Sequence, residues 1–344
     1  MRPRILIAES TGFPEHAADR LRRVGDLTLA DLNRPGLLSA IRESHVLWVR
    51  LRYHIDAEVL AAASLLRVIV TPTTGLNHID VEDADRRGVQ VLSLQGQAKF
   101  LEDVRATAEY TLALMLALLR HLPAAAAHAA HGGWHRDLFK GHELYGRSVG
   151  VVGYGRVGRI VARYLRAFEA QVFAADPHVD ARAVEPGVRL VPLPELLREA
   201  DTVTLHVSLS AETRRFFGRE QFGRMKPGAW FINSARGELV DEAALLHALR
   251  SGRLAGAAVD VLCDERATGM TRNRLVAFAR AHDNLIITPH IGGCTAESME
   301  KTETFLAERL SALLPSLFPP AGASDGQPSP AGTGALPGGA RGEQ

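Results

Sequence analysis

The chain has 344 residues, which is long enough for two domains, because one hydrophobic core rarely extends beyond about 250–300 residues. Its 46% hydrophobic and 23% charged residues exclude a disordered or fibrous chain. Forty Lys and Arg residues balance 39 Asp and Glu residues, and the net charge of +1 leaves no electrostatic footprint for a nucleic-acid partner.

The sequence favours a soluble protein of the cytoplasm with no membrane partner. The N-terminal apolar run, residues 5–8, is too short for a signal peptide and ends at Glu9. The longest apolar run, residues 112–119, is far shorter than the ~18 residues that a membrane span needs. Two cysteines, Cys263 and Cys294, make no disulfide framework, so we expect a reducing compartment.

Apolar runs and amphipathic stretches alternate in the first hundred residues. The runs typical of buried strands are residues 5–8, 46–49, 68–71 and 89–92. Helical patterns lie between them, at residues 14–23, 35–42 and 81–87. This alternation predicts an α/β domain in which helices cover both faces of a parallel sheet.

A second series of the same kind begins near residue 149. Its predicted strands are residues 149–152, 171–174, 202–205, 229–232, 255–259 and 285–288. Its predicted helices are residues 156–167, 241–250 and 273–281. We therefore expect two doubly wound parallel sheets in two α/β domains.

A long apolar segment, residues 104–122, separates the two series and ends at Pro123. As a helix it would extend about 28 Å, enough to cross from one domain to the other. A second helical pattern, residues 295–314, is placed to return to the first domain. The predicted division is a discontinuous domain of residues 1–103 and 291–314, a domain of residues 104–290, and a disordered Pro- and Gly-rich tail of residues 315–344.

A glycine-rich turn, GYGRVG at residues 153–158, follows one predicted strand and opens a helix. Gly153 permits a tight turn, Gly155 lets the backbone approach a diphosphate, and Gly158 allows close helix–strand packing. Asp176 ends the next strand, where a carboxylate binds both ribose hydroxyls and repels a 2′-phosphate. The turn therefore predicts NAD as the cofactor, whereas a plain strand–helix turn with a surface aspartate is the simpler alternative.

Three charged residues, Arg236, Glu265 and His290, each stand just beyond a predicted strand of the second series. The carboxyl ends of parallel strands meet at one edge of a sheet, so these residues can converge on one crevice. An arginine holds a carboxylate with two hydrogen bonds, and a histidine can protonate a carbonyl oxygen as hydride arrives. A glutamate beside the histidine favours the imidazolium. The alternative is three unrelated surface or capping residues.

At these motifs the chain resembles the D-isomer-specific 2-hydroxyacid dehydrogenase family, particularly its phosphoglycerate dehydrogenase-like members. The resemblance covers about residues 45–310, in the family's order. It is carried by residues 144–158, 232–242 and 288–293, and more weakly by residues 74–80. It implies a Rossmann domain for NAD and a flavodoxin-like, discontinuous substrate domain.

The resemblance also assigns roles to residues. Arg236 would bind and polarise a 2-keto acid, His290 would be the acid/base, and Glu265 would tune it. Hydride would pass between nicotinamide C4 and C2 of a small anionic 2-hydroxy or 2-keto acid. Members are commonly homodimers through the NAD domain. Beside the glycine turn and its aspartate, the residues expected around NAD are Thr74, Arg156, Val157, Ser234, Ala235, Asp260 and Gly292.

The expected substrate pocket departs from the family. Thr73 stands two residues before Gly75, where the family often has a glycine whose backbone helps to hold the substrate carboxylate. Arg266 replaces the usual proline after the glutamate, and Asp264 adds a second carboxylate beside it, so Glu265 is assigned by its spacing from Asp260.

Arg50 and Arg52 follow the predicted strand at residues 46–49, where phosphoglycerate-type relatives carry arginines that face the substrate. They would hold a second anionic group such as a phosphate. Two solvated arginines at a strand end fit the same pattern equally well.

Alternatives to a dehydrogenase remain open at this point. An NAD(H)-sensing binding protein of the corepressor type would bind the dinucleotide with little turnover, and formate or phosphite oxidation would use the same scaffold. His128, His131 and His135 are spaced to share a helical face, but without a supporting ligand set we expect no metal site.

Overall fold

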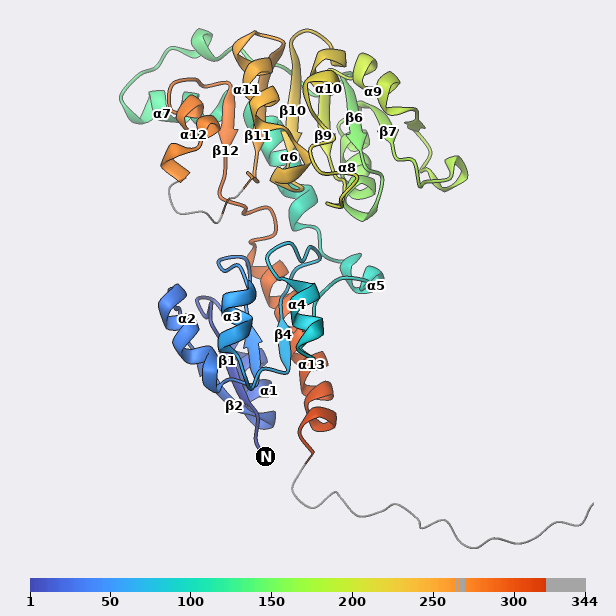
Figure 1. Ribbon diagram of the computed structural model, residues 1–344. Helices are drawn as coiled ribbons and strands as arrows, with labels where there is room; N and C mark the ends of the chain where they lie inside the picture. The colour runs from blue at the N-terminus through green and yellow to red at the C-terminus, as the bar shows by residue number, and fades with distance from the viewer. Residues whose placement is uncertain (264, 266–269, 320–344) are drawn as a thin grey trace, which may run out of the picture.

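The structure, a computed structural model, describes residues 1–263, 265 and 270–319 and contains two parallel sheets (Figure 1). The five strands of one sheet come from the N-terminal part of the chain, and the seven strands of the other come from the middle. The predicted α/β class with two doubly wound sheets is confirmed.

The first sheet has the strand order β2-β1-β3-β4-β5. Its strands are β1 (Arg4–Ile7), β2 (Asp26–Leu29), β3 (Val46–Trp48), β4 (Val68–Val70) and β5 (Gln90–Leu92). The surrounding helices are α1 (Glu15–Val24), α2 (Arg34–Ala40), η1 (Ile41–Glu43), α3 (Ala57–Ala62), α4 (Val81–Arg86) and α5 (Ala98–Leu101). The central strands β3 and β4 are buried along their whole length, which explains their uninterrupted apolar sequences.

The second sheet has the strand order β12-β11-β10-β9-β6-β7-β8. Its strands are β6 (Ser148–Val152), β7 (Gln171–Ala175), β8 (Val188–Leu190), β9 (Thr202–Leu205), β10 (Ala229–Asn233), β11 (Leu254–Val259) and β12 (Leu285–Ile287). The helices around it are α8 (Arg156–Ala167), η3 (Ala181–Ala183), α9 (Leu193–Glu199), α10 (Arg219–Arg224), η4 (Gly237–Leu239), α11 (Glu242–Arg250), η5 (Met270–Arg272) and α12 (Arg274–Ala279).

The segment between the sheets is two helices, where the sequence predicted one. The buried helix α6 (Ala106–Leu119) is separated from α7 (Leu122–Ala130) by His121, whose φ of 52° is left-handed. Pro123 lies in the first turn of α7, where its missing N–H costs nothing, so it begins a helix instead of ending one. Within the described chain no single helix is long and apolar enough to cross a membrane, and only this pair, bent by 65°, passes by length and composition.

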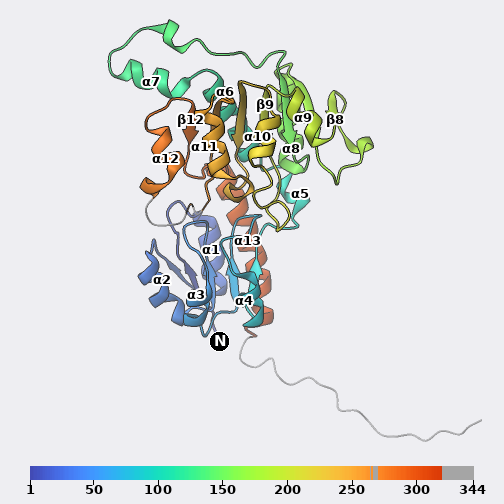
Figure 2. The ribbon, with the colours of Figure 1, turned by 45° about the horizontal axis from the view of Figure 1, so that its top comes forward.

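The C-terminal helix α13 (Ala296–Leu317) lies beside α1, next to the first sheet (Figures 1 and 2). Its apolar residues Leu306 and Leu310 share a core with Ile5 of β1. Both ends of the described chain therefore build the same lobe. The helix runs three residues beyond its predicted end at Leu314 and contains Pro315. Most of the tail expected at residues 315–344 lies outside the described residues.

Candidate active site

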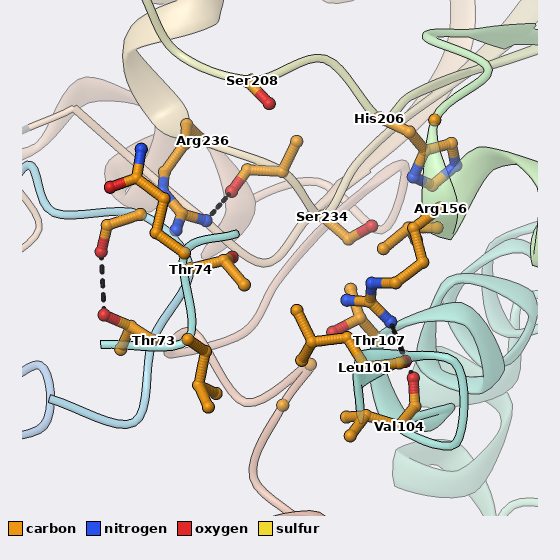
Figure 3. A pocket seen from close by; sticks show the side chains of 18 of the residues that line it. Thr73, Thr74, Leu101, Val104, Thr107, Arg156, His206, Ser208, Ser234 and Arg236 are labelled. Atoms are coloured by element: carbon orange, nitrogen blue, oxygen red, sulfur yellow. Dashed lines mark hydrogen bonds between the residues drawn. The ribbon is translucent and has the colours of Figure 1, made fainter. Parts of the chain in front are cut away.

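A cleft of about 1780 Å³ is lined by residues from both lobes. The first lobe contributes the loop after β4, including Thr73, and the second contributes Arg236 and His290. Figure 3 shows Arg236 and the threonine loop around the same space as Arg156 and Ser234. Of the residues expected at the site, those that line it are Arg50, Thr73, Thr74, Gly75, Gly155, Arg156, Val157, Ser234, Ala235, Arg236, Asp260, His290 and Gly292.

The glycine turn between β6 and α8 has the geometry of a diphosphate cradle. A Cβ on Gly153, whose φ is +91°, would lie 2.6 Å from the carbonyl oxygen of His206. A Cβ on Gly158 would lie 2.1 Å from the carbonyl oxygen of Gly153. Gly155, in contrast, has no atom within 4 Å of such a Cβ and faces the cleft. The first and third glycines are thus needed for packing, while the second leaves open space before the N-terminus of α8, which fits a diphosphate.

Asp176 immediately follows β7 and is held beside this turn. Its Oδ2 accepts a hydrogen bond from the Tyr154 amide at 2.9 Å, and its Oδ1 accepts one from the His178 amide at 2.9 Å. Asp176, Gly153 and Gly158 lie outside the set of described residues that line the cleft. They shape the turn behind its wall, and the position of the carboxylate fits recognition of a ribose next to the diphosphate.

Arg236 follows β10 and lies directly against Gly75 of the other lobe. A Cβ on Gly75 would be 2.2 Å from Nη2 of Arg236, so a glycine is required for this approach. Arg236 Nη1 donates to the carbonyl of Ala235 at 2.6 Å. Asn233, buried at the end of β10, fixes the loop: its Nδ2 donates to the carbonyl of Arg236 at 2.9 Å and its Oδ1 accepts from the amide of Ala235 at 3.0 Å. Asn233 was not among the predicted site residues, although a polar residue inside a buried strand is a usable signal.

His290 and Glu265 form the predicted pair. Nδ1 of His290 lies 2.6 Å from Oε1 of Glu265, and about a fifth of each side chain is exposed. His290 has a left-handed φ of 56°, an uncommon conformation for a residue with a side chain. Its amide donates to the carbonyl of Asp260 at 2.8 Å, which helps to hold this conformation. Asp264 and Arg266 lie outside the described residues.

Asp260 organises the loop that carries His290. Its Oδ1 accepts from the Thr288 hydroxyl at 2.7 Å and the Ile291 amide at 2.9 Å, and its Oδ2 accepts from the Gly292 amide at 2.7 Å. Burial raises the pKa of Asp260, and these hydrogen bonds and the nearby His290 oppose that rise. Asp260 therefore touches the cleft but also fixes the backbone around the histidine.

Burial lowers the pKa of two further basic residues at the cleft, Arg156 and His206. Arg156 reaches from α8 to the carbonyl oxygens of Leu101 and Val104, at 3.1 and 2.8 Å, and so bridges the lobes (Figure 3). Burial, and secondly the nearby Arg105, lower the pKa of Arg156. Burial lowers the pKa of His206 to about 3, so this imidazole is neutral at physiological pH.

The side chains of Arg50 and Arg52 contact different parts of the first lobe. Arg50 lines the cleft, donates from Nε to Oε1 of Glu303 at 2.6 Å, and donates from Nη1 to the Thr11 carbonyl at 2.8 Å. Arg52 is outside the described lining, and its Nη2 lies 3.2 Å from Oδ1 of Asp31. Glu303 was not anticipated, because it belongs to a helix at the opposite end of the chain.

Thr73 is engaged by its own loop. Its hydroxyl donates to the carbonyl of Gly75 at 2.8 Å and lies 3.1 Å from the hydroxyl of Thr71. Among the histidines set aside above, the rings of His128 and His135 are 5.8 Å apart. Nowhere in the described chain are three or more His, Cys, Asp or Glu side chains grouped to hold a metal ion.

Comparison with known sequences and structures gives one consistent relationship. Residues 112–292 match the sequence profile described as D-isomer specific 2-hydroxyacid dehydrogenase, NAD binding domain. The chain is 38% identical over 289 residues to a D-3-phosphoglycerate dehydrogenase of Mycobacterium tuberculosis, covering 84% of this chain and 52% of that protein. It thus spans about half the length of those relatives.

Two other proteins are similar over nearly their whole length. A hydroxypyruvate reductase of Thermotoga maritima is 34% identical over 285 residues, which are 83% of this chain and 90% of that protein. The solved structure of D-lactate dehydrogenase from Aquifex aeolicus, complexed with NAD and lactic acid, superposes with a TM-score of 0.79 at 26% identity, covering 91% of this chain and 96% of that one.

Proposed function

The chain belongs to the D-isomer specific 2-hydroxyacid dehydrogenase family, and on that premise we propose that it is an NAD-dependent oxidoreductase acting between a D-2-hydroxy acid and its 2-keto acid. The observation that carries this proposal is the convergence of Arg236 and His290 on the cleft that Gly155 of the glycine turn also lines, with Glu265 held against His290 outside the described lining. We further propose residues 104–290 as the NAD domain and residues 1–103 with 291–314 as the substrate domain.

The glycine turn and its neighbours would hold the dinucleotide. Gly155 would receive the diphosphate at the N-terminus of α8, in a turn whose shape depends on Gly153 and Gly158, and Asp176 would bind the ribose and disfavour a 2′-phosphate. When bound, NAD supplies the hydride acceptor, and NADH the donor, at C4 of the nicotinamide. The residues proposed to surround the rest of the dinucleotide are Thr74, Arg156, Val157, Ser234, Ala235, Asp260 and Gly292.

Arg236 would bind the substrate carboxylate and polarise the adjacent carbonyl. A guanidinium suits this role because it offers two parallel donors to a carboxylate. Its approach to Gly75 supports a substrate site at the junction of the lobes, with Thr73 and Gly75 as its floor.

His290 would transfer the proton. As hydride reaches C2 of the keto acid, the C2 oxygen takes a proton from the imidazole, and in the oxidation direction the imidazole takes it back. Glu265 would accept the Nδ1 hydrogen bond, which fixes the orientation of the ring and leaves Nε2 for the substrate oxygen.

We also propose a homodimer through the NAD domain. Helix α7 and the segment after it project from the second lobe in both views (Figures 1 and 2). This projection exposes large apolar side chains, Trp134 at 91% and Leu138 at 69%, which a second copy would cover. Light scattering coupled to size-exclusion chromatography should give twice the monomer mass for the wild-type protein. The double variant Trp134→Ser, Leu138→Ser should give the monomer mass. A monomer mass for the wild-type protein would contradict the dimer.

The direct test of the proposed function is turnover. Purified protein with NADH should reduce at least one of glyoxylate, pyruvate, hydroxypyruvate and 3-phosphohydroxypyruvate, followed by loss of NADH absorbance. Tight NADH binding without consumption of any of them would instead support a dinucleotide-sensing protein.

A further inference from the structure

A buried ion pair forms the wall of the cleft on the side of the first lobe. Glu303 of α13 is fully buried and lines the cleft together with Arg50, which follows β3. Oε1 of Glu303 accepts from Nε of Arg50 at 2.6 Å. Two further atoms of these side chains, Oε2 of Glu303 and Nη2 of Arg50, are buried and have no hydrogen-bond partner among the described residues. Buried polar atoms normally have a hydrogen-bond partner, so Oε2 of Glu303 is an acceptor, and Nη2 of Arg50 a donor, that a ligand group would complete.

The charge around Arg50 is predominantly negative. Glu9, also buried and also in the cleft wall, accepts from the backbone amide of Arg50 at 2.8 Å. Burial raises the pKa of both Glu9 and Glu303, and the charge of Glu9 adds to the rise at Glu303. Arg52 is turned toward Asp31. The guanidinium of Arg50 is thus paired with Glu303, while Glu9 lies at the backbone amides of Arg50 and Arg52 and is also acted on by the charge of Arg52, so little positive charge of Arg50 is left for an anionic ligand.

We propose, resting on the dehydrogenase function above, that Glu303 and Arg50 form a specificity-determining subsite for an uncharged hydroxyl group at the end of the 2-keto acid remote from its carboxylate. A hydroxyl group both accepts and donates, so it can accept from Nη2 of Arg50 and donate to Oε2 of Glu303 at the same time. A methyl group leaves both atoms unsatisfied in a buried site. A phosphate brings negative charge against Glu303 and Glu9, which disfavours it.

The subsite is placed to meet the far end of a short substrate. Strands β3 and β4 are neighbours, and the amide of Val49 donates to the carbonyl of Val70 at 3.0 Å, so Arg50 stands beside the start of the loop that holds Thr73 and Gly75. Gly75 is the residue against which Arg236 packs. A keto acid whose carboxylate is held at Arg236 can therefore extend along this edge of the first sheet toward Arg50 and Glu303.

The test compares matched substrates in one enzyme. For the wild-type protein with NADH, kcat/KM should be at least about tenfold higher for hydroxypyruvate than for pyruvate, and higher for 4-hydroxy-2-ketobutyrate than for 2-ketobutyrate. It should be at least about tenfold lower for 3-phosphohydroxypyruvate than for hydroxypyruvate. Equal rates within the hydroxyl and methyl pairs, as expected if the subsite holds only water, or faster reduction of the phosphorylated acid, would overturn the inference.

Two variants of Glu303 separate the two effects. Glu303→Gln removes the charge and keeps an oxygen that can accept from Arg50, so the phosphorylated acid should gain about tenfold relative to hydroxypyruvate. Glu303→Leu removes the acceptor, so the preference for hydroxypyruvate over pyruvate should fall toward one. Glu308→Gln, an exposed change on the same helix that affects only a surface pair with Arg20, should keep the wild-type ratios.

The outcomes distinguish this inference from the proposed function. If no 2-keto acid is reduced, the dehydrogenase proposal fails. If 2-keto acids are reduced but the kcat/KM ratio of 3-phosphohydroxypyruvate to hydroxypyruvate is the same in Glu303→Gln as in wild type, only the subsite proposal fails. Should Glu303→Leu not fold, the ratios of the wild-type protein and of Glu303→Gln still decide.

Discussion

Adding a single methyl group at Gly75 should displace Arg236 and strongly lower kcat/KM without unfolding the protein. In Gly75→Ala the new Cβ would lie 2.2 Å from Nη2, 2.9 Å from Cζ and 3.0 Å from Nε of Arg236. To bring the closest contact from 2.2 to an ordinary 3.4 Å, the guanidinium must move by 1.2 Å. A misplacement of about 1 Å costs on the order of 100-fold in rate when a group must be oriented, so kcat/KM should fall by about that factor.

The assay is NADH-dependent reduction of the best 2-keto acid, together with thermal melting and NADH binding. Gly75 does not require a left-handed backbone, so melting should change little. Gly223→Ala is the matched control, because this helical glycine has nothing within 4 Å of the added methyl group and should keep wild-type kinetics. A Gly75→Ala protein with wild-type kcat/KM would refute the placement of Arg236 in the substrate site.

Two other residues give predictions of different kinds. Asp176→Ala removes the acceptor of the Tyr154 and His178 amides and the proposed ribose contact. The KM for NAD should therefore rise about tenfold, and the ratio of kcat/KM for NAD to that for NADP should fall. An unchanged ratio would contradict the assignment of Asp176 to the ribose. Because burial raises the pKa of Glu303, its ionised form destabilises the fold above that raised pKa, and the penalty disappears as pH falls to the usual glutamate value of about 4.3. The melting temperature of Glu303→Gln relative to wild type should therefore rise as the pH increases from 4 to 8, and a difference between the two proteins that does not change with pH would show that the charge of Glu303 is not the cause.

Much of the fold followed from local sequence because most strands of both sheets are buried. Strands such as β9 and β10 appear as unbroken apolar runs. The edge strands β2 and β8 were missed because they are largely exposed and carry no such run. The end of α6 was predicted three residues late, at residue 122, because the chain turns at the left-handed His121, for which the sequence holds no glycine signal.

The candidate site was predictable where it depends on strand ends and glycines. Arg236, Glu265 and His290 follow three adjacent parallel strands, β10, β11 and β12, so strand prediction alone brings them to one edge of the sheet. The Arg50–Glu303 pair joins residues 253 positions apart, which neither motif nor periodicity reveals. Such long-range pairs depend on the tertiary packing of α13 against the first lobe, which no local pattern in the sequence indicates.

The proposed reaction requires that His290 transfer the proton while hydride moves at C2. The most direct measurement is kcat for the best 2-keto acid with His290→Gln, alongside the Kd for NADH of the same protein. The kcat should fall by about 100- to 10,000-fold with an unchanged Kd, because general acid catalysis is lost and the dinucleotide site is kept. A wild-type kcat in this variant would show that His290 does not transfer the proton.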